Sequence, residues 1–200
     1  MAAPVRHVAA IILAAGEGSR FGGQKLLAPL RGRPLVQHVL DAATASSLSP
    51  VTLVVGAGAD ALLAALDLGR AVARPNPAAA SGQASSLQVG LRAARDADAA
   101  VVLLGDQPGV TAGLIEALIV RQRASGAAAV LCAWEGRRLP PALLHRDLWP
   151  AIEALSGDIG AREILAGRDD VAVVEVDPTL GSLEDVDTRD DHARLVPPRT

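Results

Sequence analysis

The stretch AAIILAAGEGSRFGGQKLL (residues 9–27) limits the fold of this chain more than any other part of the sequence. A continuous apolar run, typical of a buried strand, passes directly into a segment with four glycines, Arg20 and Lys25. Glycines let backbone N–H groups come close to an anion, while Arg20 as a planar fork and Lys25 as a point charge can reach the same phosphates. The sequence therefore predicts a strand followed by a polyphosphate-binding loop. The alternative is a glycine-rich turn that carries two solvated basic residues.

Apolar runs of strand length recur along the chain and alternate with helical patterns. The runs cover residues 8–13, 51–55, 99–104, 127–133 and 171–176. Between them, residues three or four positions apart share one helix face: Leu35, Val39 and Ala43, then Leu87, Leu91 and Ala94, then Leu114, Leu118 and Arg121. Alternating strands and helices predict an α/β fold, a single-domain three-layer α/β/α sandwich with a mostly parallel sheet.

Two irregular stretches are candidate binding loops. RPNPAAASGQASS (residues 74–86) and GRRLPP (residues 136–141) lack both strand and helix periodicity. In open α/β sheets, ligands bind where such loops leave the ends of strands. We therefore expect these stretches to line a binding cleft rather than to link domains.

Size and charge exclude several classes of protein. A chain of 200 residues fits one domain, which we place at residues 1–195 with a frayed tail at 196–200. A formal charge of -3 without a basic tract argues against nucleic acid, and no apolar run reaches membrane-spanning length. The single cysteine, Cys132, is most simply a core thiol in a reducing compartment. We expect a cytoplasmic protein, the short apolar run after Arg6 being a weaker candidate for a secretory signal.

The glycine loop matches neither of two common nucleotide-binding motifs. A dinucleotide-binding Gly-x-Gly-x-x-Gly motif after Gly16 and Gly18 requires a third glycine where Phe21 stands. A Walker loop requires Gly-Lys-Ser/Thr, whereas Gln24 precedes Lys25 here. Both a dinucleotide-binding fold and a P-loop ATPase are therefore disfavoured.

The motifs together resemble a known family. LAAGEGSRFGGQKLL followed by GRPLVQHVL resembles the signature loop of the MobA-like nucleotidyltransferases. Its Leu-Ala-Ala-Gly start is similar to the MocA-type branch that uses CTP, which contains molybdenum cofactor cytidylyltransferase. The resemblance continues in order through NPAAASGQASSLQVGL, LLGDQPGV, LSGDIGAREIL and LEDVDTRDD, which begin at residues 76, 103, 155 and 183. These segments extend over most of the chain.

The resemblance implies a fold, a reaction and a set of ligands. The fold is a Rossmann-like nucleotidyltransferase fold of the GT-A type, and the reaction transfers CMP from CTP to the phosphate of molybdopterin or its molybdenum-bearing form. Mg²⁺, with Mn²⁺ as the alternative, is the expected cofactor, and an apo-molybdoenzyme is a further expected partner. Lys25 would hold the α-phosphate and the attacking phosphate, and Arg20 the β- and γ-phosphates. The nucleotide-binding set is Leu13, Ala14, Ala15, Gly16, Gly18, Ser19, Arg20, Lys25, Gly82, Ser85 and Ser86.

Carboxylates after two predicted strands are the candidate metal ligands. Asp106 follows a buried run directly, where its carboxylate can project into the cleft at the carboxyl edge of the sheet. Hard divalent cations take one or two protein carboxylates together with phosphate oxygens, and the resemblance implies the same role for Asp106. Asp185 and, close behind it, Asp187 are candidates for a second ligand. The alternatives are a turn at Asp106 and a helix cap near Thr188.

Other candidate site residues have ordinary structural explanations of equal weight. Ser85 and Ser86 can contact the base, or they can cap a helix that starts near Ser85. Arg162 can bind the phosphate on the pterin side, or it can complete an ion pair on a helix face. The four histidines, His7, His38, His145 and His192, lack metal-site spacing and are interpreted as surface or packing residues.

The sequence departs from the family in two places. Where family members carry Gly-His-Pro or Gly-x-Pro before a strand, this chain reads RLPPALL, with Pro140 and Pro141, and proline cannot donate a backbone hydrogen bond. Arg189 stands where the family favours proline. We therefore expect the nucleotide half of the cleft to be intact and the acceptor to be less determined. Another donor or acceptor, such as GTP, a sugar 1-phosphate or an alcohol phosphate, and a non-catalytic cofactor carrier or chaperone are the alternative functions.

Overall fold

In the computed structural model, which describes residues 2–16 and 18–196, a seven-stranded sheet forms the centre of the molecule. Its strand order is β5-β4-β1-β6-β8-β7-β9, and every neighbouring pair is parallel except the two that involve β8. The strands are β1 (Val8–Ala14), β4 (Val51–Val55), β5 (Val72–Pro75), β6 (Ala99–Leu104), β7 (Ala129–Trp134), β8 (Arg137–His145) and β9 (Val171–Glu175).

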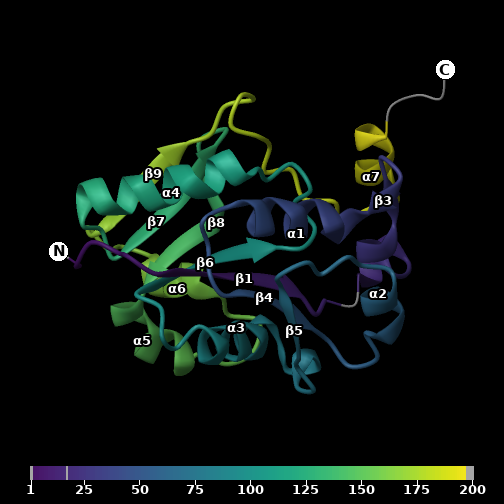
Figure 1. The fold of residues 1–200 in the computed structure, drawn as a ribbon, viewed down its shortest axis with the longest axis horizontal. Helices are drawn as coiled ribbons and strands as arrows, with labels where there is room; N and C mark the ends of the chain where they lie inside the picture. Colours follow the sequence, from purple (N-terminus) through teal and green to yellow (C-terminus); the bar gives the residue numbers. More distant parts are fainter. Residues whose placement is uncertain (1, 17, 197–200) are drawn as a thin grey trace.

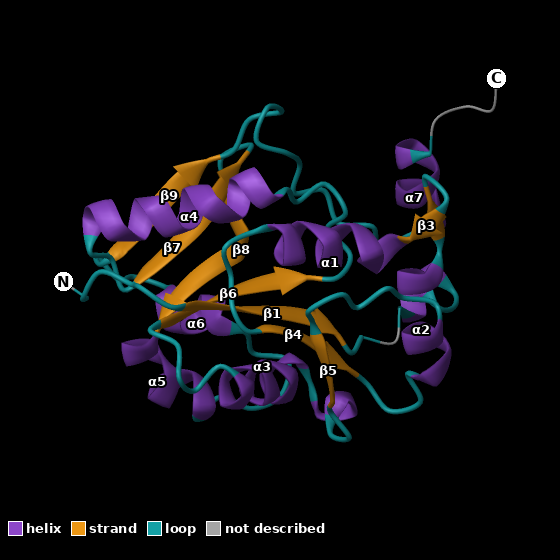
Figure 2. Ribbon diagram, viewed as in Figure 1, coloured by secondary structure: helices purple, strands orange, loops and turns teal. Residues whose placement is uncertain are grey.

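Helices cover both faces of this sheet (Figures 1 and 2). Helices α1 and α4 share a buried cluster with one face, and α3, α5 and α6 share a second cluster with the other. The helices are α1 (Leu35–Ala45), α2 (Asp60–Ala64), α3 (Gln83–Ala93), α4 (Ala112–Ser125), α5 (Trp149–Glu153), α6 (Ala161–Leu165) and α7 (Arg189–Leu195). The predicted α/β/α sandwich with a mostly parallel sheet is confirmed.

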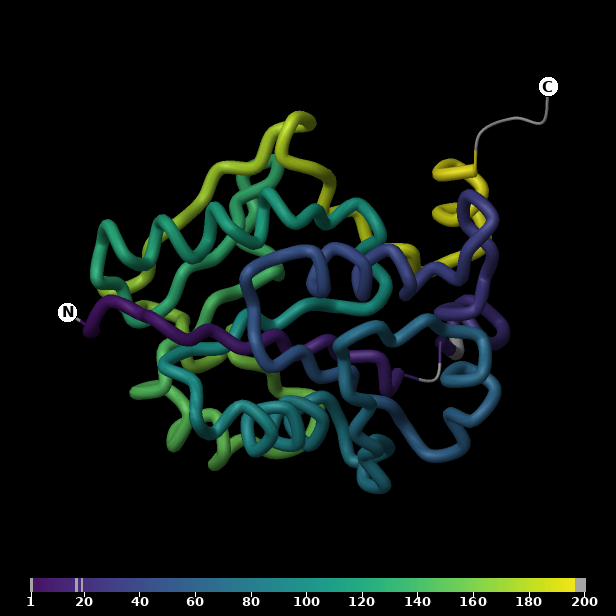
Figure 3. Tube along the Cα trace, in the orientation of Figure 1, coloured from purple at the N-terminus to yellow at the C-terminus, as the bar shows by residue number. Residues whose placement is uncertain are grey.

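Short elements complete the chain between the main strands and helices. A hairpin of β2 (Pro29–Leu30) and β3 (Arg33–Pro34) precedes α1. The 3-10 turns are η1 (Ser19–Phe21), η2 (Lys25–Leu27), η3 (Ala79–Ser81) and η4 (Arg146–Leu148). In the tube trace the β2–β3 hairpin lies beside the yellow C-terminal helix α7, far from it in sequence (Figure 3).

The predicted strands and helix faces correspond closely to the observed ones. Each of the five apolar runs forms a strand, and β1 lies between β4 and β6 with both of its faces covered. The residues predicted to face the core on α1 and α3 are buried, as are Leu114 and Leu118 on α4. Arg121, which follows Leu118 by three positions toward the end of α4, is exposed to solvent.

Strand β8 was not predicted, and it passes through the stretch GRRLPP, which was expected to be irregular. Two prolines break the periodicity of a strand, and they lie at a bulge where the pairing with β7 shifts between Leu131 and Cys132. Only Ala142–His145 of β8 pair with β6, so the first half of β8 diverges from the end of β6. This divergence opens the sheet at its carboxyl edge. Likewise, β5 includes Arg74 and Pro75, at the start of the other stretch expected to be irregular.

No helix in the described ranges is long and apolar enough to cross a bilayer, and α4, with 14 residues, is well short of that length. The side chain of Cys132 is fully buried in β7. Burial raises the pKa of its thiol to about 12, as expected for a thiol that acts only as a small apolar group.

Candidate active site

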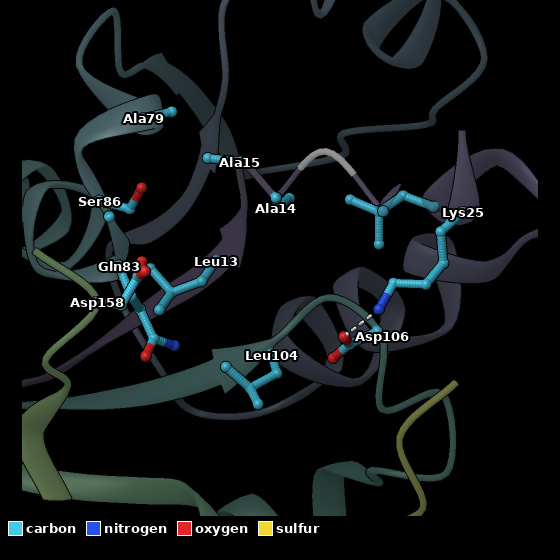
Figure 4. Close-up of a pocket in the computed structure, with 14 residues that line it drawn as sticks. Leu13, Ala14, Ala15, Lys25, Ala79, Gln83, Ser86, Leu104, Asp106 and Asp158 are labelled. Atoms are coloured by element: carbon cyan, nitrogen blue, oxygen red, sulfur yellow. Dashed lines mark hydrogen bonds and ion pairs between the residues drawn. The ribbon is translucent and has the colours of Figure 1, made fainter. Parts of the chain in front are cut away.

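A cavity of about 300 Å³ lies at the carboxyl edge of the sheet, where β1 and β6 end. It brings together the glycine loop, the start of α3, the end of β6 and the loop before α6, all of which the sequence analysis singled out (Figure 4). Its lining consists of Leu13, Ala14, Ala15, Gly16, Gly18, Lys25, Leu26, Ala79, Gly82, Gln83, Ser86, Leu104, Asp106 and Asp158. We call it the edge cavity.

The glycine loop is folded tightly at the mouth of the edge cavity. The N–H of Phe21 donates to the carbonyl of Gly18, and that of Lys25 donates to the carbonyl of Gly23. Gly18 has a φ of +60°, and a Cβ there would lie 2.9 Å from the carbonyl oxygen of Gly23 and 3.0 Å from Cβ of Lys25. Only glycine fits this turn, which delivers Lys25 to the cavity wall.

Lys25 forms ion pairs with two aspartates from distant parts of the chain. Its Nζ lies 2.7 Å from Oδ2 of Asp106 and 3.2 Å from Oδ1 of Asp187, and Figure 4 shows the first of these pairs. Burial on its own lowers the pKa of Lys25, but the hydrogen bonds and charges of the two carboxylates outweigh that effect and raise the pKa above its ordinary value. Lys25 is therefore a charged ammonium at neutral pH.

The segment at residues 180–187 docks along the loop that follows β6 and so delivers the second aspartate. The N–H of Val186 donates to the carbonyl of Asp106, and the N–H of Ser182 to the carbonyl of Gly109. The fully buried Gln107 donates its side-chain amide to the carbonyl of Leu183. These bonds join residues about 70 to 80 positions apart, which no local sequence signal specifies.

Of the two acids proposed as a second metal ligand, Asp187 lies with Asp106 on the Lys25 ammonium, whereas Asp185 does not contact Lys25 in the described hydrogen bonds. The pKa of Asp185 is raised by partial burial and by the negative charges of Asp106 and Asp187. Within residues 2–16 and 18–196, no group of three or more His, Cys, Asp or Glu side chains forms a metal cage. The arrangement therefore suits a cation held by two carboxylates and by ligand oxygens.

Helix α7 connects these acids to the glycine loop. Thr188 is its N-cap, so neither Asp185 nor Asp187 caps the helix, and Thr188 forms a capping box with Asp191, whose carboxylate also accepts the N–H of Asp187. Arg189, the departure from the family pattern, donates its Nε to the carbonyl of Phe21 and stacks its guanidinium on that ring, 5.8 Å from the centroid. Arg189 thus serves as a contact between the helix and the loop.

The opposite end of the edge cavity is also polar and is closed by tight backbone packing. Gln83, Ser86 and Asp158 line this end (Figure 4). Gly82, with a φ of +111°, lies so close to the loop before α6 that a Cβ would be 2.2 Å from the carbonyl carbon of Gly157. This contact brings the SGQASS and LSGDIG motifs together across the cavity.

The two serines proposed for base contact have partners within the protein. The side-chain amide of Asn76 donates to Oγ of Ser85 at 2.8 Å and to Oγ of Ser86 at 2.9 Å. The Ser85 hydroxyl also donates to a backbone carbonyl, and Ser85 does not line the edge cavity, whereas Ser86 does. Helix α3 begins at Gln83 with Gly82 as its N-cap, so neither serine is the N-cap.

Arg20 is not brought together with Lys25 and Asp106. It is exposed in η1 and lies outside the lining of the edge cavity. Contact between Arg20 and the cavity requires its side chain to turn inward. The side chain of Ser19, another predicted nucleotide contact, lies outside what the structure describes.

A second cavity of about 650 Å³ adjoins the first, and we call it the side cavity. The divergence of β8 from β6 forms one wall, and α3 and α6 form the others. Its lining is largely apolar and includes Arg137 and Arg138 of β8 and Arg162 of α6. The two cavities share Leu13, Gln83 and Leu104, so a ligand in one can contact a ligand in the other.

Sequence reasoning overlooked four polar residues at the site: Asn76, Gln83, Gln107 and Asp158. All four lie within recognised motifs, in which other residues, such as Gly82, Asp106 and Arg162, were taken as the candidate site residues. The signal that could have found Asn76 and Gln107 is an amide directly beside a proline at the end of a strand. Such side-chain amides often form the hydrogen bonds that buried polar groups of neighbouring loops require.

Comparison with known families and proteins agrees with this geometry. Residues 10–173 match the family model described as the MobA-like NTP transferase domain. The chain is 34% identical to nicotine blue oxidoreductase of Paenarthrobacter nicotinovorans, covering 94% of this chain and 96% of that protein. It is 29% identical to the purine catabolism protein PucB of Bacillus subtilis strain 168, covering 93% and 94%.

Among solved structures, Rv0371c of Mycobacterium tuberculosis H37Rv superposes with a TM-score of 0.82 at 28% identity, covering 98% of both chains. A structure of Rv0371c in complex with manganese has a TM-score of 0.78 at 25% identity, covering 97% of this chain and all of that one (100%). The similarity to these proteins thus extends over nearly the whole chain.

Proposed function

The chain belongs to the MobA-like NTP transferase family and is a nucleotidyltransferase, and from this premise we propose that it transfers CMP from CTP to the phosphate of molybdopterin. The products are molybdopterin cytosine dinucleotide and pyrophosphate. The observation that carries the proposal is the edge cavity, in which the glycine loop and the SGQASS loop face the Lys25–Asp106 ion pair. The choice of CTP and molybdopterin rests on the motif resemblance.

The edge cavity provides different chemistry at its two ends. At one end the glycine loop offers backbone N–H groups and the Lys25 ammonium, which suit the phosphates. At the other end Gln83, Ser86 and Asp158 offer hydrogen-bond donors and acceptors, which suit a base. Apolar atoms of Leu13 and Leu104 lie between the two ends and can support the ribose.

The acidic residues fit a divalent cation. Oδ1 of Asp106 is buried and has no hydrogen-bond partner among the described residues, and such an oxygen is a ligand that Mg²⁺ or Mn²⁺ accepts. Asp106 and Asp187 would hold the ion, with Asp185 close by. When bound, the ion neutralises negative charge on the phosphates.

The side cavity suits the acceptor. Its apolar walls can cover a flat heterocycle, and Arg162, Arg137 and Arg138 can pair with an anionic group. Because the side cavity meets the edge cavity at Leu13, Gln83 and Leu104, an acceptor phosphate can reach the nucleotide. Pro140 of β8 lines this cavity, and proline has no backbone N–H to donate. At this position, therefore, recognition of the acceptor falls to the neighbouring side chains.

The proposed reaction needs positioning and charge neutralisation more than a strong base. An oxygen of the acceptor phosphate, already anionic at neutral pH, attacks the α-phosphorus of CTP. A new P–O bond forms, the bond from the α-phosphorus to the bridging oxygen breaks, and pyrophosphate leaves with the electron pair. Lys25 stabilises charge on the α-phosphate, and the cavity walls hold the two phosphates in line.

Arg20 has a proposed role at the outer end of the triphosphate. From its exposed position in η1 it can bind the β- and γ-phosphates after its side chain turns toward the cavity. An arginine that meets the ligand from solvent adds affinity through paired hydrogen bonds to phosphate oxygens.

A direct assay tests the proposal. The protein is incubated with each of the four NTPs, Mg²⁺ or Mn²⁺ and purified molybdopterin, and products are identified by mass while pyrophosphate is followed. We expect the dinucleotide from CTP. Product formed from GTP would show that the donor is not CTP, and product formed with a sugar 1-phosphate would show that the acceptor is not molybdopterin. Molybdopterin binding without turnover would favour a cofactor carrier. Because one relative is named an oxidoreductase, NADH and NADPH oxidation is measured in parallel.

Two substitutions assign the roles within this reaction. Lys25→Ala is expected to lower kcat at least about a hundredfold, because it removes a donor aimed at the transferred phosphate. Arg162→Ala is expected to raise the KM for molybdopterin, with Arg121→Ala, on the exposed side of α4, as the matched control. An unchanged kcat in Lys25→Ala removes the proposed role of this lysine.

A further inference from the structure

The Lys25 ammonium stands in the place where the two proposed metal ligands converge. Its Nζ is within hydrogen-bond distance of Oδ2 of Asp106 and Oδ1 of Asp187, 2.7 Å and 3.2 Å away. The side chains of Lys25 and Asp106 are only 12% and 22% exposed, so water screens this pair weakly. The ammonium therefore pairs with both carboxylates and offsets one of their two negative charges.

This position competes with two other tasks. A divalent cation bound to the same carboxylates lies about 2.0–2.6 Å from their oxygens and carries a charge of the same sign as the ammonium. An ammonium held between Asp106 and Asp187 also has only one of its three N–H donors left for the α-phosphate of the proposed function. Lys25 and a divalent cation therefore compete for the charge of the two carboxylates.

We propose that Lys25 is a placeholder cation that keeps divalent metal out of the site until the nucleotide arrives. In the nucleotide-free protein its charge occupies Asp106 and Asp187, so the site binds free metal weakly. The phosphates of the nucleotide offer the ammonium a new anionic partner, and the carboxylates then receive the cation. The inference rests on the proposed function, because it assumes that these carboxylates take the metal together with a nucleotide.

The acidic surroundings explain why such a placeholder is useful. Asp106 and Asp187 share the ammonium, so its removal leaves two carboxylates close together, and their negative charges also act on Asp185. Without a placeholder, such a group attracts free cations and repels the triphosphate. With Lys25 in place, metal and nucleotide are expected to enter together.

Mn²⁺ binding without nucleotide tests the inference with a readout that needs no turnover. Free Mn²⁺ is measured by electron paramagnetic resonance in titrations of the wild type, Lys25→Met and Arg121→Met. Lys25→Met is expected to bind Mn²⁺ about tenfold more tightly than the wild type, because a unit charge next to both ligands is gone. Arg121→Met removes the same charge from the exposed side of α4, outside the edge cavity, and is expected to leave the affinity unchanged.

Two further variants keep the result decisive. In Lys25→Met/Asp106→Asn the gain is expected to disappear, which places the bound Mn²⁺ at this site. Lys25→Gln, which retains hydrogen-bonding capacity, repeats the test if the methionine variant does not fold. With the α,β-methylene analogue of CTP present, the advantage of the lysine variants is expected to be lost, because the wild-type ammonium is then on the phosphates.

The outcome separates this inference from the proposed function. Equal Mn²⁺ affinity in the wild type and both lysine variants, or an equal gain in Arg121→Met, overturns the placeholder role even if the wild type forms the expected dinucleotide. Absence of product from CTP overturns the transfer proposal and leaves the nucleotide-free Mn²⁺ measurement as it stands.

Discussion

Gly82 is the position where a single methyl group should perturb the site most. It has a φ of +111°, and a Cβ there would lie 2.2 Å from the carbonyl carbon of Gly157, 2.3 Å from its oxygen and 2.6 Å from N of Asp158. All three are backbone atoms, which cannot rotate away as a flexible side chain can. Gly82→Ala must therefore displace the loop before α6 from the start of α3.

The cost can be worked from the structure. Holding alanine at this φ costs about 2 kcal/mol. Displacing the loop also breaks the hydrogen bond from the N–H of Ala84 to the carbonyl of Gly157, worth about 1 kcal/mol. The sum of about 3 kcal/mol corresponds to a fall in Tm of about 6–12 °C for a domain of this size. The displaced loop carries Asp158 away from the edge cavity, so the KM for the nucleotide should rise about tenfold.

Gly69→Ala is the matched control for this prediction. Gly69 also has a positive φ, +51°, but a Cβ there meets nothing within 4 Å. This substitution should cost only the backbone strain, about 1 kcal/mol. Urea unfolding followed by circular dichroism gives both free energies, and pyrophosphate release gives the KM. If Gly82→Ala is no less stable than Gly69→Ala, or binds nucleotide normally, the close packing at Gly82 does not have the consequence we assign to it.

Three further predictions concern other parts of the molecule. Thr188→Ala should destabilise the protein by about 1 kcal/mol in urea unfolding, because it removes the N-cap of α7. It should also weaken Mn²⁺ binding in the presence of nucleotide, because the capping box includes Asp191, which holds the N–H of Asp187. Normal Mn²⁺ binding by this variant would show that the cap does not affect the site. Cys132 should resist Ellman's reagent at pH 8 in the folded protein and react fully in denaturant, because burial raises its pKa to about 12; rapid reaction in the native state contradicts that burial. The N–H groups of Arg6 and His7 lower the pKa of Asp98 in the folded protein, so its contribution to stability is present above about pH 4 and is lost as the pH falls through the folded pKa. Asp98→Ala should accordingly have a lower free energy of unfolding than the wild type at pH 7 and nearly the same value at pH 2. A difference that stays constant with pH would show that the contribution of Asp98 does not come from its charge.

Much of the fold was predictable because its signals are local. The five apolar runs became strands, and the periodic faces of α1 and α3 became buried faces, since periodicity reports which side of an element leaves water. The glycine loop was predictable for the same reason: the turn at Gly18 admits no side chain, whatever lies elsewhere in the chain. Spacing cannot tell where burial ends along such a face: Arg121 follows Leu118 by three positions and is exposed.

The site was predictable only in part, because its residues meet across long separations. Asp106 could be placed from the strand before it, but the choice between Asp185 and Asp187 depends on how the segment at residues 180–187 hydrogen-bonds to the loop after β6. Nothing near Asn76 in the sequence shows that it binds Ser85 and Ser86. Such contacts are decided by packing and not by propensity.

The sequence by itself determined the alternation of strands and helices, the tight glycine turn and the acid after β6, because each depends on residues within one turn or one strand. Only the tertiary structure decided that β8 runs antiparallel and opens a second cavity, that Arg20 faces solvent, and that the Lys25 ammonium rests between Asp106 and Asp187. These features require segments up to 162 residues apart to lie side by side, and their energies exist only once the core has brought those segments together.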